Sequence, residues 1–159
     1  MIAEYVGRAL PPSRPYLVGR EKVREFALAV GEGASVCTDL DAARAAGHPD
    51  LVAPPTFAVA FTLPLMEAFL RDPAVGWDYG HMVHGEQSFT AHRPLCAGDE
   101  VVTTLHVDEL RERAGSLFLT LRSEVADSAG EPVLTAVSLM VTVAAPTGAA
   151  AEPATGVAG

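Results

Sequence analysis

The stretch Ala53-Pro54-Pro55-Thr56, followed by FAVAFTLPLMEAFL at residues 57–70, decides the fold of this 159-residue chain. The double proline forms a rigid turn, and the run after it is long enough for a helix of several turns. The run is apolar on nearly every side, so we expect a helix that is buried all round. Pro64 lies inside the run and is expected to kink the helix or loosen one turn.

Beyond residue 82 the apolar residues alternate with their neighbours, which is typical of strands. One strand is predicted over residues 81–92, and three alternating runs follow, separated by turn signals at Ala114-Gly115 and Ala129-Gly130. The alternating residues are Val101, Thr103, Leu105 and Val107; Leu117, Leu119, Leu121 and Ser123; and Val133, Thr135, Val137, Leu139 and Val141. This pattern predicts an antiparallel sheet packed on one apolar helix, which is an α+β arrangement.

The chain before the double proline is expected to be mostly helical. Residues 16–18 suit a short strand, residues 20–30 show helical apolar spacing, and Asp39 is a candidate cap for a helix over residues 40–46. Residues 144–159 consist almost entirely of Ala, Gly, Pro, Thr and Val, and we expect a disordered tail there. The expected organisation is therefore one domain, residues 1–143, followed by this tail.

The composition narrows the classes of partner. The formal net charge is −9, and an acidic surface repels phosphate backbones, so nucleic-acid binding is not expected. No apolar run reaches the roughly 18 residues of a membrane span, and the first residues do not resemble a secretory signal, so we expect no membrane partner and a cytoplasmic location. Cys37 and Cys96 have no metal-type spacing and are expected to be free thiols.

Three segments, taken in order, resemble those of one family. They are Gly31-Glu32-Gly33-Ala34-Ser35-Val36-Cys37, then Ala53-Pro54-Pro55-Thr56-Phe57, then Val83-His84-Gly85-Glu86-Gln87 with Arg93-Pro94-Leu95-Cys96-Ala97-Gly98-Asp99. Together they resemble the MaoC-like hydratase/dehydratase family, and within it the actinobacterial proteins related to accessory subunits of the mycolic-acid 3-hydroxyacyl-carrier dehydratase. The resemblance implies a hot-dog fold, in which an antiparallel sheet wraps a long central helix, and a homodimer or a heterodimer.

Active members of this family add or remove water across the α,β-double bond of an acyl thioester, using the Asp and His of a Gly-Asp-x-Asn-Pro-x-His segment. In this sequence Glu32 matches the Asp position and Cys37 the His position. A thiol titrates near ~8.5 and forms weak hydrogen bonds, so loss of the His removes an acid–base contribution of roughly 10²–10⁴-fold. Glu32 and Cys37 are therefore either a residual catalytic pair or a solvated carboxylate beside a packed thiol.

His84 and Glu86 are the other candidate catalytic residues. On a regular strand the two share a face, and with His81 they form a cluster of titratable groups that is a candidate source of replacement acid–base chemistry. The alternative is that His84 holds the start of the strand by hydrogen bonds. The spacing of these residues does not match a zinc site, and we expect no metal.

The double-proline turn supplies the candidate substrate-binding residues. Pro54, Pro55 and Thr56 start the central helix, whose N-terminus suits a thioester carbonyl. The Thr56 N–H is the expected oxyanion donor, because Pro55 has no N–H. Phe57 is expected either to line an acyl tunnel or to belong to the core, and His81 to border the substrate.

The resemblance implies a lyase, a 3-hydroxyacyl-thioester dehydratase or enoyl hydratase of fatty-acid or polyketide metabolism. Its substrates are acyl-CoA or acyl carrier protein thioesters, and no cofactor is implied. Because the His is missing, two alternatives stay open. The chain is a non-catalytic substrate-channel subunit of a heterodimer with another MaoC-like chain, or it is a hot-dog thioesterase, for which Glu67 is the one carboxylate well inside the central helix.

Overall fold

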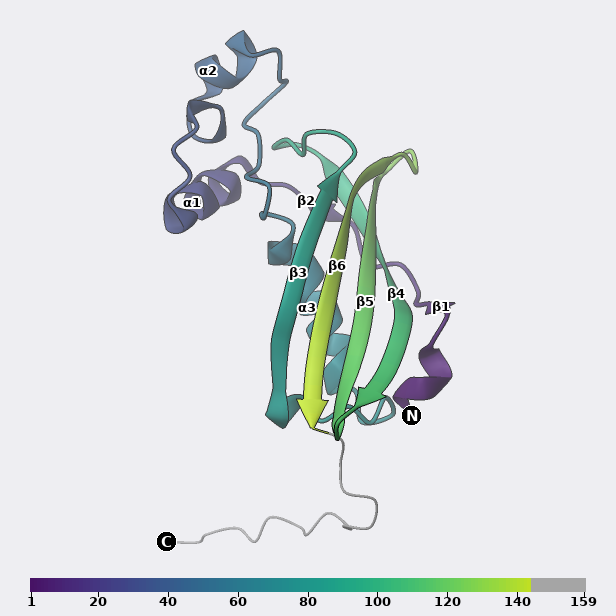
Figure 1. Cartoon of the computed structure of the whole chain (residues 1–159). Helices are drawn as coiled ribbons and strands as arrows, with labels where there is room; N and C mark the ends of the chain where they lie inside the picture. The colour runs from purple at the N-terminus through teal and green to yellow at the C-terminus, as the bar shows by residue number, and fades with distance from the viewer. Residues whose placement is uncertain (144–159) are drawn as a thin grey trace, which may run out of the picture.

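The computed structural model describes residues 1–143, and the expected tail, residues 144–159, lies outside the described residues. The described chain is a six-stranded antiparallel sheet with one helix, α3, lying along one of its faces (Figure 1). This confirms the expected α+β hot-dog architecture. Within residues 1–143, no helix is both long enough and apolar enough to cross a membrane.

The sheet has the strand order β1-β4-β5-β6-β3, and β2 also pairs with β4. Strands β4, β5 and β6 follow one another as hairpins, whereas β3 precedes them in the chain and pairs with β6, so β3 is an edge strand. The predicted strands are all present, and the last three are longer than predicted. The strands are β1 (Arg8–Ala9), β2 (Tyr16–Leu17), β3 (Met82–Ala91), β4 (Glu100–Arg113), β5 (Ser116–Asp127) and β6 (Pro132–Val143).

The apolar run after the double proline forms α3 (Val59–Arg71), as predicted, and the helix continues through Pro64. The side of α3 that faces the sheet contributes to two apolar clusters. Phe61 packs in the first cluster, together with Phe57, and Met66 and Leu70 pack in the second. The two clusters hold the helix against the sheet along its whole length.

The expectation that α3 is buried all round is wrong. Pro64 and Ala68 are exposed on the side turned away from the sheet, and Leu63 and Glu67 are half-buried there. The sheet covers one side of the helix, and the described residues place no second layer on the other. The apolar composition of that second side is therefore not explained by packing within one chain.

The helices that precede α3 lie beyond the end of the sheet at which β3 stops (Figure 1). Helix α1 (Arg20–Val30) has the predicted bounds and ends at Gly31, whose φ of 71° is the left-handed cap that glycine adopts readily. Helix α2 (Leu40–Ala45) is capped by Asp39, which accepts two backbone N–H groups at 2.9 and 3.3 Å. Besides β1, the elements that were not predicted are short 3-10 helices, η1 (Ile2–Tyr5), η2 (Ser35–Cys37) and η3 (Tyr79–His81).

The strands differ in which of their alternating residues face α3. In β4 and β5 the alternating residues of the sequence pattern face the helix. In β6 their neighbours do, since Ala136 and Met140 are buried, while Val137, Leu139 and Val141 are half-buried on the outer face. Strand β6 is therefore apolar on both faces.

The turn between β4 and β5 generates a stability prediction. Ala114 and Gly115 have φ values of 51° and 73°, as in a type I′ turn, which favours Asn-Gly. Because the left-handed conformation costs an alanine about 1–2 kcal/mol, we expect Ala114→Asn to raise the free energy of unfolding by about 1 kcal/mol, measured by chemical denaturation. Ala129→Asn, in the β5–β6 turn, is the matched control because Ala129 has no positive φ. An equal gain in both variants would contradict this explanation.

The ion pair between α1 and the chain after α2 generates a prediction about pH. Arg20 donates two hydrogen bonds to Asp50, at 2.9 and 2.5 Å, and thereby lowers the Asp50 pKa from 3.8 to about 2. Since the pKa is lower in the folded state, the stabilisation is present above pH 4 and is lost as the pH falls toward 2. In Arg20→Gln we expect the Asp50 pKa, measured by carboxyl NMR, to rise toward 3.8. Lys22→Gln is the control, and an Asp50 pKa that stays near 2 in Arg20→Gln would refute the assignment.

Candidate functional site

A pocket of about 390 Å³ lies at the N-terminal end of α3. Its walls are residues 52–55 and Ala58 on one side, and the end of β3 with residues 91–95 on the other. Phe89 and Leu134 complete its apolar lining. A mostly apolar pocket of this size, with few polar groups, is typical of a small-molecule site.

The polar rim of this pocket comes from His92 and Arg93, which the sequence analysis did not select. Arg93 donates to Asp99 at 2.8 and 3.2 Å and to Asp127 at 3.4 Å, and these contacts raise the pKa of its guanidinium. The His92 ring lies 3.0 Å from the Thr135 hydroxyl. Because Arg93 is held by two carboxylates, its main role is to fix the loop that forms this wall. The sequence feature that could have identified Arg93 is the segment Arg-Pro-Leu-Cys-Ala-Gly-Asp, because it has Arg93 at one end and its ion-pair partner Asp99 at the other.

Pro54 and Pro55, two of the candidate substrate-binding residues, line the pocket, and Thr56 is exposed beside them. The turn begins at Pro54, whose carbonyl accepts the Phe57 N–H at 2.9 Å. Among the described residues, no hydrogen bond is formed by the Thr56 N–H. Phe57 does not line the pocket, since it is fully buried and packs edge-to-face on Phe26 with ring centroids 5.3 Å apart. The core alternative for Phe57 is therefore the one that the structure supports.

Glu32 and Cys37 lie in the loop between α1 and α2, behind the pocket wall. The loop is joined to that wall where the Val52 N–H donates to the Val36 carbonyl at 2.9 Å. One Glu32 oxygen accepts the Ala34 N–H at 2.9 Å, and Cys37 is 4% exposed. Neither side chain lines the pocket.

His81, His84 and Glu86 lie at the start of β3, whereas the end of this strand borders the pocket. Ten residues of strand span roughly 33 Å, so one chain does not bring these residues together with Glu32 and Cys37. His81 is bound to Asp78 at 2.8 Å on the surface. The candidate catalytic residues thus divide into two groups at opposite ends of the sheet.

The expectation that His84 and Glu86 share a face is wrong, because a β-bulge at Gly85 separates them. His84 is in register with Met140, which faces α3, and Glu86 is in register with Leu139, which lies on the outer face. Glycine fits closely at the bulge, since a Cβ atom on residue 85 would lie 3.3 Å from a methyl group of Val141, which would have to shift by a few tenths of an ångström. This bulge prevents His84 and Glu86 from acting on one group.

Glu67, the carboxylate considered for a thioesterase, is also remote from the pocket. Nine residues separate it from Ala58, which corresponds to roughly 14 Å of helix. It accepts a hydrogen bond from the Tyr79 hydroxyl at 2.6 Å, and Arg71 lies over the Tyr79 ring at 3.8 Å. In the described chain Glu67 therefore anchors the segment after α3 rather than facing a substrate pocket.

The pocket combines an apolar lining with a helix N-terminus, and this arrangement suits an acyl thioester better than an ion or a nucleotide. The backbone N–H of Thr56 is available to a carbonyl oxygen. No group of three or more His, Cys, Asp or Glu residues within residues 1–143 is arranged to hold a metal ion. The residues that line the pocket include one histidine, His92, but no aspartate or glutamate, so the lining does not contain a carboxylate–histidine pair.

The sequence has close relatives. A sequence model of the FAS1-like, dehydratase domain region matches residues 4–136. A UPF0336 protein of Saccharopolyspora erythraea is 49% identical over 137 residues, which cover 86% of this chain and 88% of the relative. A UPF0336 protein of Streptomyces coelicolor is 47% identical over 140 residues, which cover 88% of this chain and 93% of the relative.

Two solved structures align with this chain at a TM-score of 0.79. One is the C-terminally truncated HadBC complex, the (3R)-hydroxyacyl-ACP dehydratase of Mycobacterium tuberculosis, at 28% identity over 89% of this chain and 99% of that chain. The other is a MaoC-like dehydratase, at 35% identity over 91% of this chain but only 44% of that chain. The matching sequence model, the relatives and the shared architecture agree, and this chain belongs to the FAS1-like dehydratase-region family of MaoC-like proteins.

Proposed function

We propose that this chain is the non-catalytic subunit of a heterodimeric MaoC-like dehydratase. It shapes the site for a 3-hydroxyacyl thioester of CoA or acyl carrier protein, and a second MaoC-like chain supplies the Asp and His. The observation that carries the proposal is the buried thiol of Cys37, which the sequence resemblance matches to the family's catalytic His.

The environment of Cys37 opposes a role in proton transfer. Burial raises the pKa of the Cys37 thiol, and the nearby charge of Glu32 raises it further. The thiol is therefore protonated near neutral pH, and an S–H group is a weak hydrogen-bond donor. Glu32 is engaged by the Ala34 N–H within its own loop. These contacts support the packed-thiol alternative over a residual catalytic pair.

The pocket at the start of α3 supports a binding role. Its apolar lining suits an acyl chain, and the helix N-terminus suits the thioester oxygen. Both features act on the substrate without a titratable side chain. In this proposal Pro54, Pro55 and Thr56 keep the substrate-binding role that the sequence suggested.

The open edge of β3 supports pairing with a second chain. Strand β3 is ten residues long and pairs with β6 alone among the described strands, so one side carries unpaired backbone groups. A strand of the partner that pairs with β3 in the antiparallel sense runs in the opposite direction to β3. The start of the partner strand therefore lies beside the end of β3, at the pocket. The exposed apolar side of α3, at Pro64 and Ala68, provides further surface for such a partner.

The comparisons support the same assembly. The HadBC structure is a complex of a (3R)-hydroxyacyl-ACP dehydratase. The MaoC-like dehydratase is a chain of which this one covers 44%, so its length has room for a second domain of this size. A single domain of this family with an incomplete acid–base pair is expected to need a complementary domain.

The proposal predicts that activity appears only with a partner. Incubated alone with crotonyl-CoA, the folded chain is expected to cause no absorbance loss above buffer. Co-purified with a MaoC-like chain that has the Asp and His, encoded next to it, the complex is expected to hydrate the substrate. Replacing the partner's His with Ala should lower kcat by roughly 10²–10⁴-fold, whereas Cys37→Ala in this chain should leave kcat within about twofold. Turnover by this chain alone that Cys37→Ala abolishes would overturn the proposal.

A second prediction concerns the thiol itself. In Cys96→Ser, which leaves Cys37 as the one cysteine, we expect alkylation by iodoacetamide at pH 7.5 to be at least about tenfold slower than that of a free thiol, because the thiolate is the reactive form. Unfolding in urea should restore the free-thiol rate. A fast reaction in the folded protein would indicate an activated cysteine, and with it a catalytic role for Cys37.

A further inference from the structure

The side chain of His84 lies on the α3 side of β3 but has no partner within the described chain. His84 is in register with Met140, which is buried between the sheet and α3, yet His84 itself is exposed. Among residues 1–143 its imidazole forms no hydrogen bond and no ion pair, whereas the imidazoles of His81 and His92 do. The alternative role, holding the start of the strand by hydrogen bonds, therefore has no support in these residues.

The next side chains on this face of β3 are held within the chain. Gln87 accepts a hydrogen bond from the Ser138 hydroxyl at 2.6 Å and donates one to the Val137 carbonyl at 3.1 Å. Phe89 packs against the first apolar cluster. On the α3 side of β3, His84 is thus a polar side chain that remains available to a group outside the chain.

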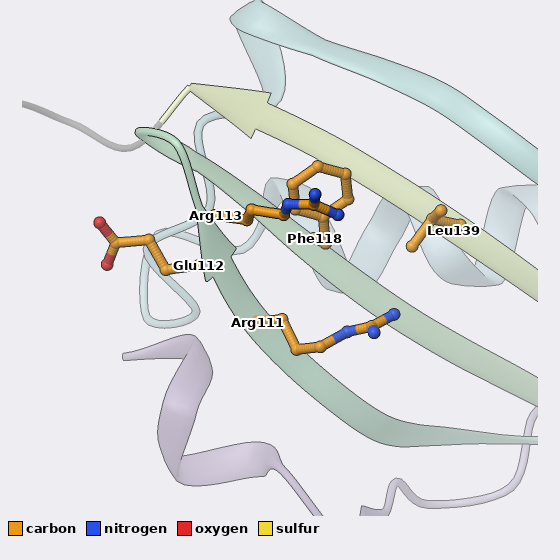
Figure 2. Close-up of a pocket in the computed structure, with 5 residues that line it drawn as sticks. All are labelled: Arg111, Glu112, Arg113, Phe118 and Leu139. Atoms are coloured by element: carbon orange, nitrogen blue, oxygen red, sulfur yellow. The ribbon is translucent and has the colours of Figure 1, made fainter.

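Glu86 and Ser88 lie on the opposite, outer face of the sheet. Figure 2 shows this outer face around Phe118 and Leu139, which border a hollow of about 470 Å³. Glu86 is in register with Leu139, and Glu86 and Ser88 line a second hollow beside Leu139. A group on the α3 side is therefore out of reach of both residues, and Ser88 is a suitable control for His84.

Antiparallel pairing at the free edge of β3 determines which side a partner presents. The two-fold axis of such a pair is perpendicular to the sheet, so a partner of the same fold continues the sheet with its own helix on the same side as α3. The start of each β3 then lies beside the end of the other strand, and in this chain that end borders the pocket. His84 is therefore on the side of the sheet, and at the end of the interface, where the partner's pocket lies.

The strand register places His84 opposite a position that lines the pocket. In full overlap Met82 lies opposite the partner's equivalent of Ala91. Because Gly85 is the extra residue of the bulge, His84 then lies opposite the partner's equivalent of Phe89. Both Phe89 and Ala91 line the pocket of this chain. Residues directly opposite each other share a face, with Cβ atoms about 4.5–5.5 Å apart.

A shift of the register by one residue is unfavourable, because it would join the core side of one strand to the outer side of the other. A shift by two residues keeps the faces matched. Toward the pocket, such a shift brings His84 opposite the partner's equivalent of Ala91, which is also a pocket-lining position.

We propose that His84 of this chain reaches the pocket of the partner chain and donates a hydrogen bond to the acyl thioester bound there. This inference rests on the proposed function, in which the partner supplies the Asp and His. A pocket of this kind has an apolar lining with few polar groups, and a neutral imidazole carries one N–H donor, which suits an oxygen atom of the thioester.

The proposal reunites the two groups of candidate residues that one chain keeps at opposite ends of β3. Across the interface, the start of β3 in this chain meets the pocket end of the partner. A second copy of this chain in place of the partner would offer His84 a pocket without the Asp and His. The complete site therefore needs both kinds of chain, and each contributes side chains that touch the substrate.

Kinetics of the co-purified heterodimer with crotonyl-CoA tests the contact. His84→Ala in this chain is expected to lower kcat/KM by roughly threefold to tenfold, the effect of losing one neutral hydrogen bond. His84→Gln keeps an N–H donor and should stay within about twofold of the parent. Ser88→Ala, on the same strand but on the outer face, is the matched control and should leave kcat/KM unchanged. Sedimentation velocity should give the same heterodimer dissociation constant for all three variants.

The failure of this inference and that of the proposed function are distinguishable. An active heterodimer in which His84→Ala keeps the kcat/KM of the parent would refute the contact and leave the proposed function intact. An effect of His84→Ala that is explained entirely by a weaker heterodimer, or that His84→Gln and Ser88→Ala share in full, would also refute it. If no active complex forms with any MaoC-like chain that has the Asp and His, the proposed function fails, and this inference fails with it.

Discussion

The packing of α3 against the inner face of the sheet is the constraint on which the rest of this structure depends. Phe57 and Phe61 at one end of the helix, and Met66 and Leu70 at the other, fill two apolar clusters between helix and sheet. Because this packing fixes the direction of α3, it also fixes the double-proline turn at the end of the sheet where β3 stops. The pocket exists because the turn and the strand end meet there.

The packing of α3 on the sheet forms the pocket but does not bring the candidate acid–base residues into it. The loop that carries Glu32 and Cys37 is attached to the pocket wall through Val52, yet both side chains are occupied within the loop or the core. The other candidate catalytic residues, His81, His84 and Glu86, lie at the far end of β3, and the bulge at Gly85 puts His84 and Glu86 on opposite faces. A pocket without a pair of acid–base side chains, beside an unpaired strand edge, agrees with the proposed role of this chain as the non-catalytic subunit of a heterodimer.

The sequence was sufficient to predict the long helices and strands and the family, but not β1 or the short 3-10 helices. The apolar run after Pro54-Pro55 is too long for a strand and lacks its alternation, so it had to be a helix, and the alternating runs had to be strands. The sequence resemblance also suggested that Cys37 matches the position of the family's His, because that match depends on residue order within one segment. Predictions of this kind depend only on residues that are neighbours in the sequence, so they can be made without knowledge of the tertiary structure.

Tertiary structure alone decided which residues meet. The sequence grouped His84 with Glu86, but the bulge turned them apart, because one extra residue in a strand reverses the facing of all that follow. It did not select His92 and Arg93, which reach the pocket only because β3 ends beside the double-proline turn. In β6 the alternation pointed to the set with Val137, Leu139 and Val141, yet the neighbouring set, which includes Ser138 and Thr142, faces α3, so the position of α3 decides that Met140 is core and Leu139 is surface. Periodicity fixes the kind of element, whereas the facing of each side chain is set by contacts between segments far apart in the chain.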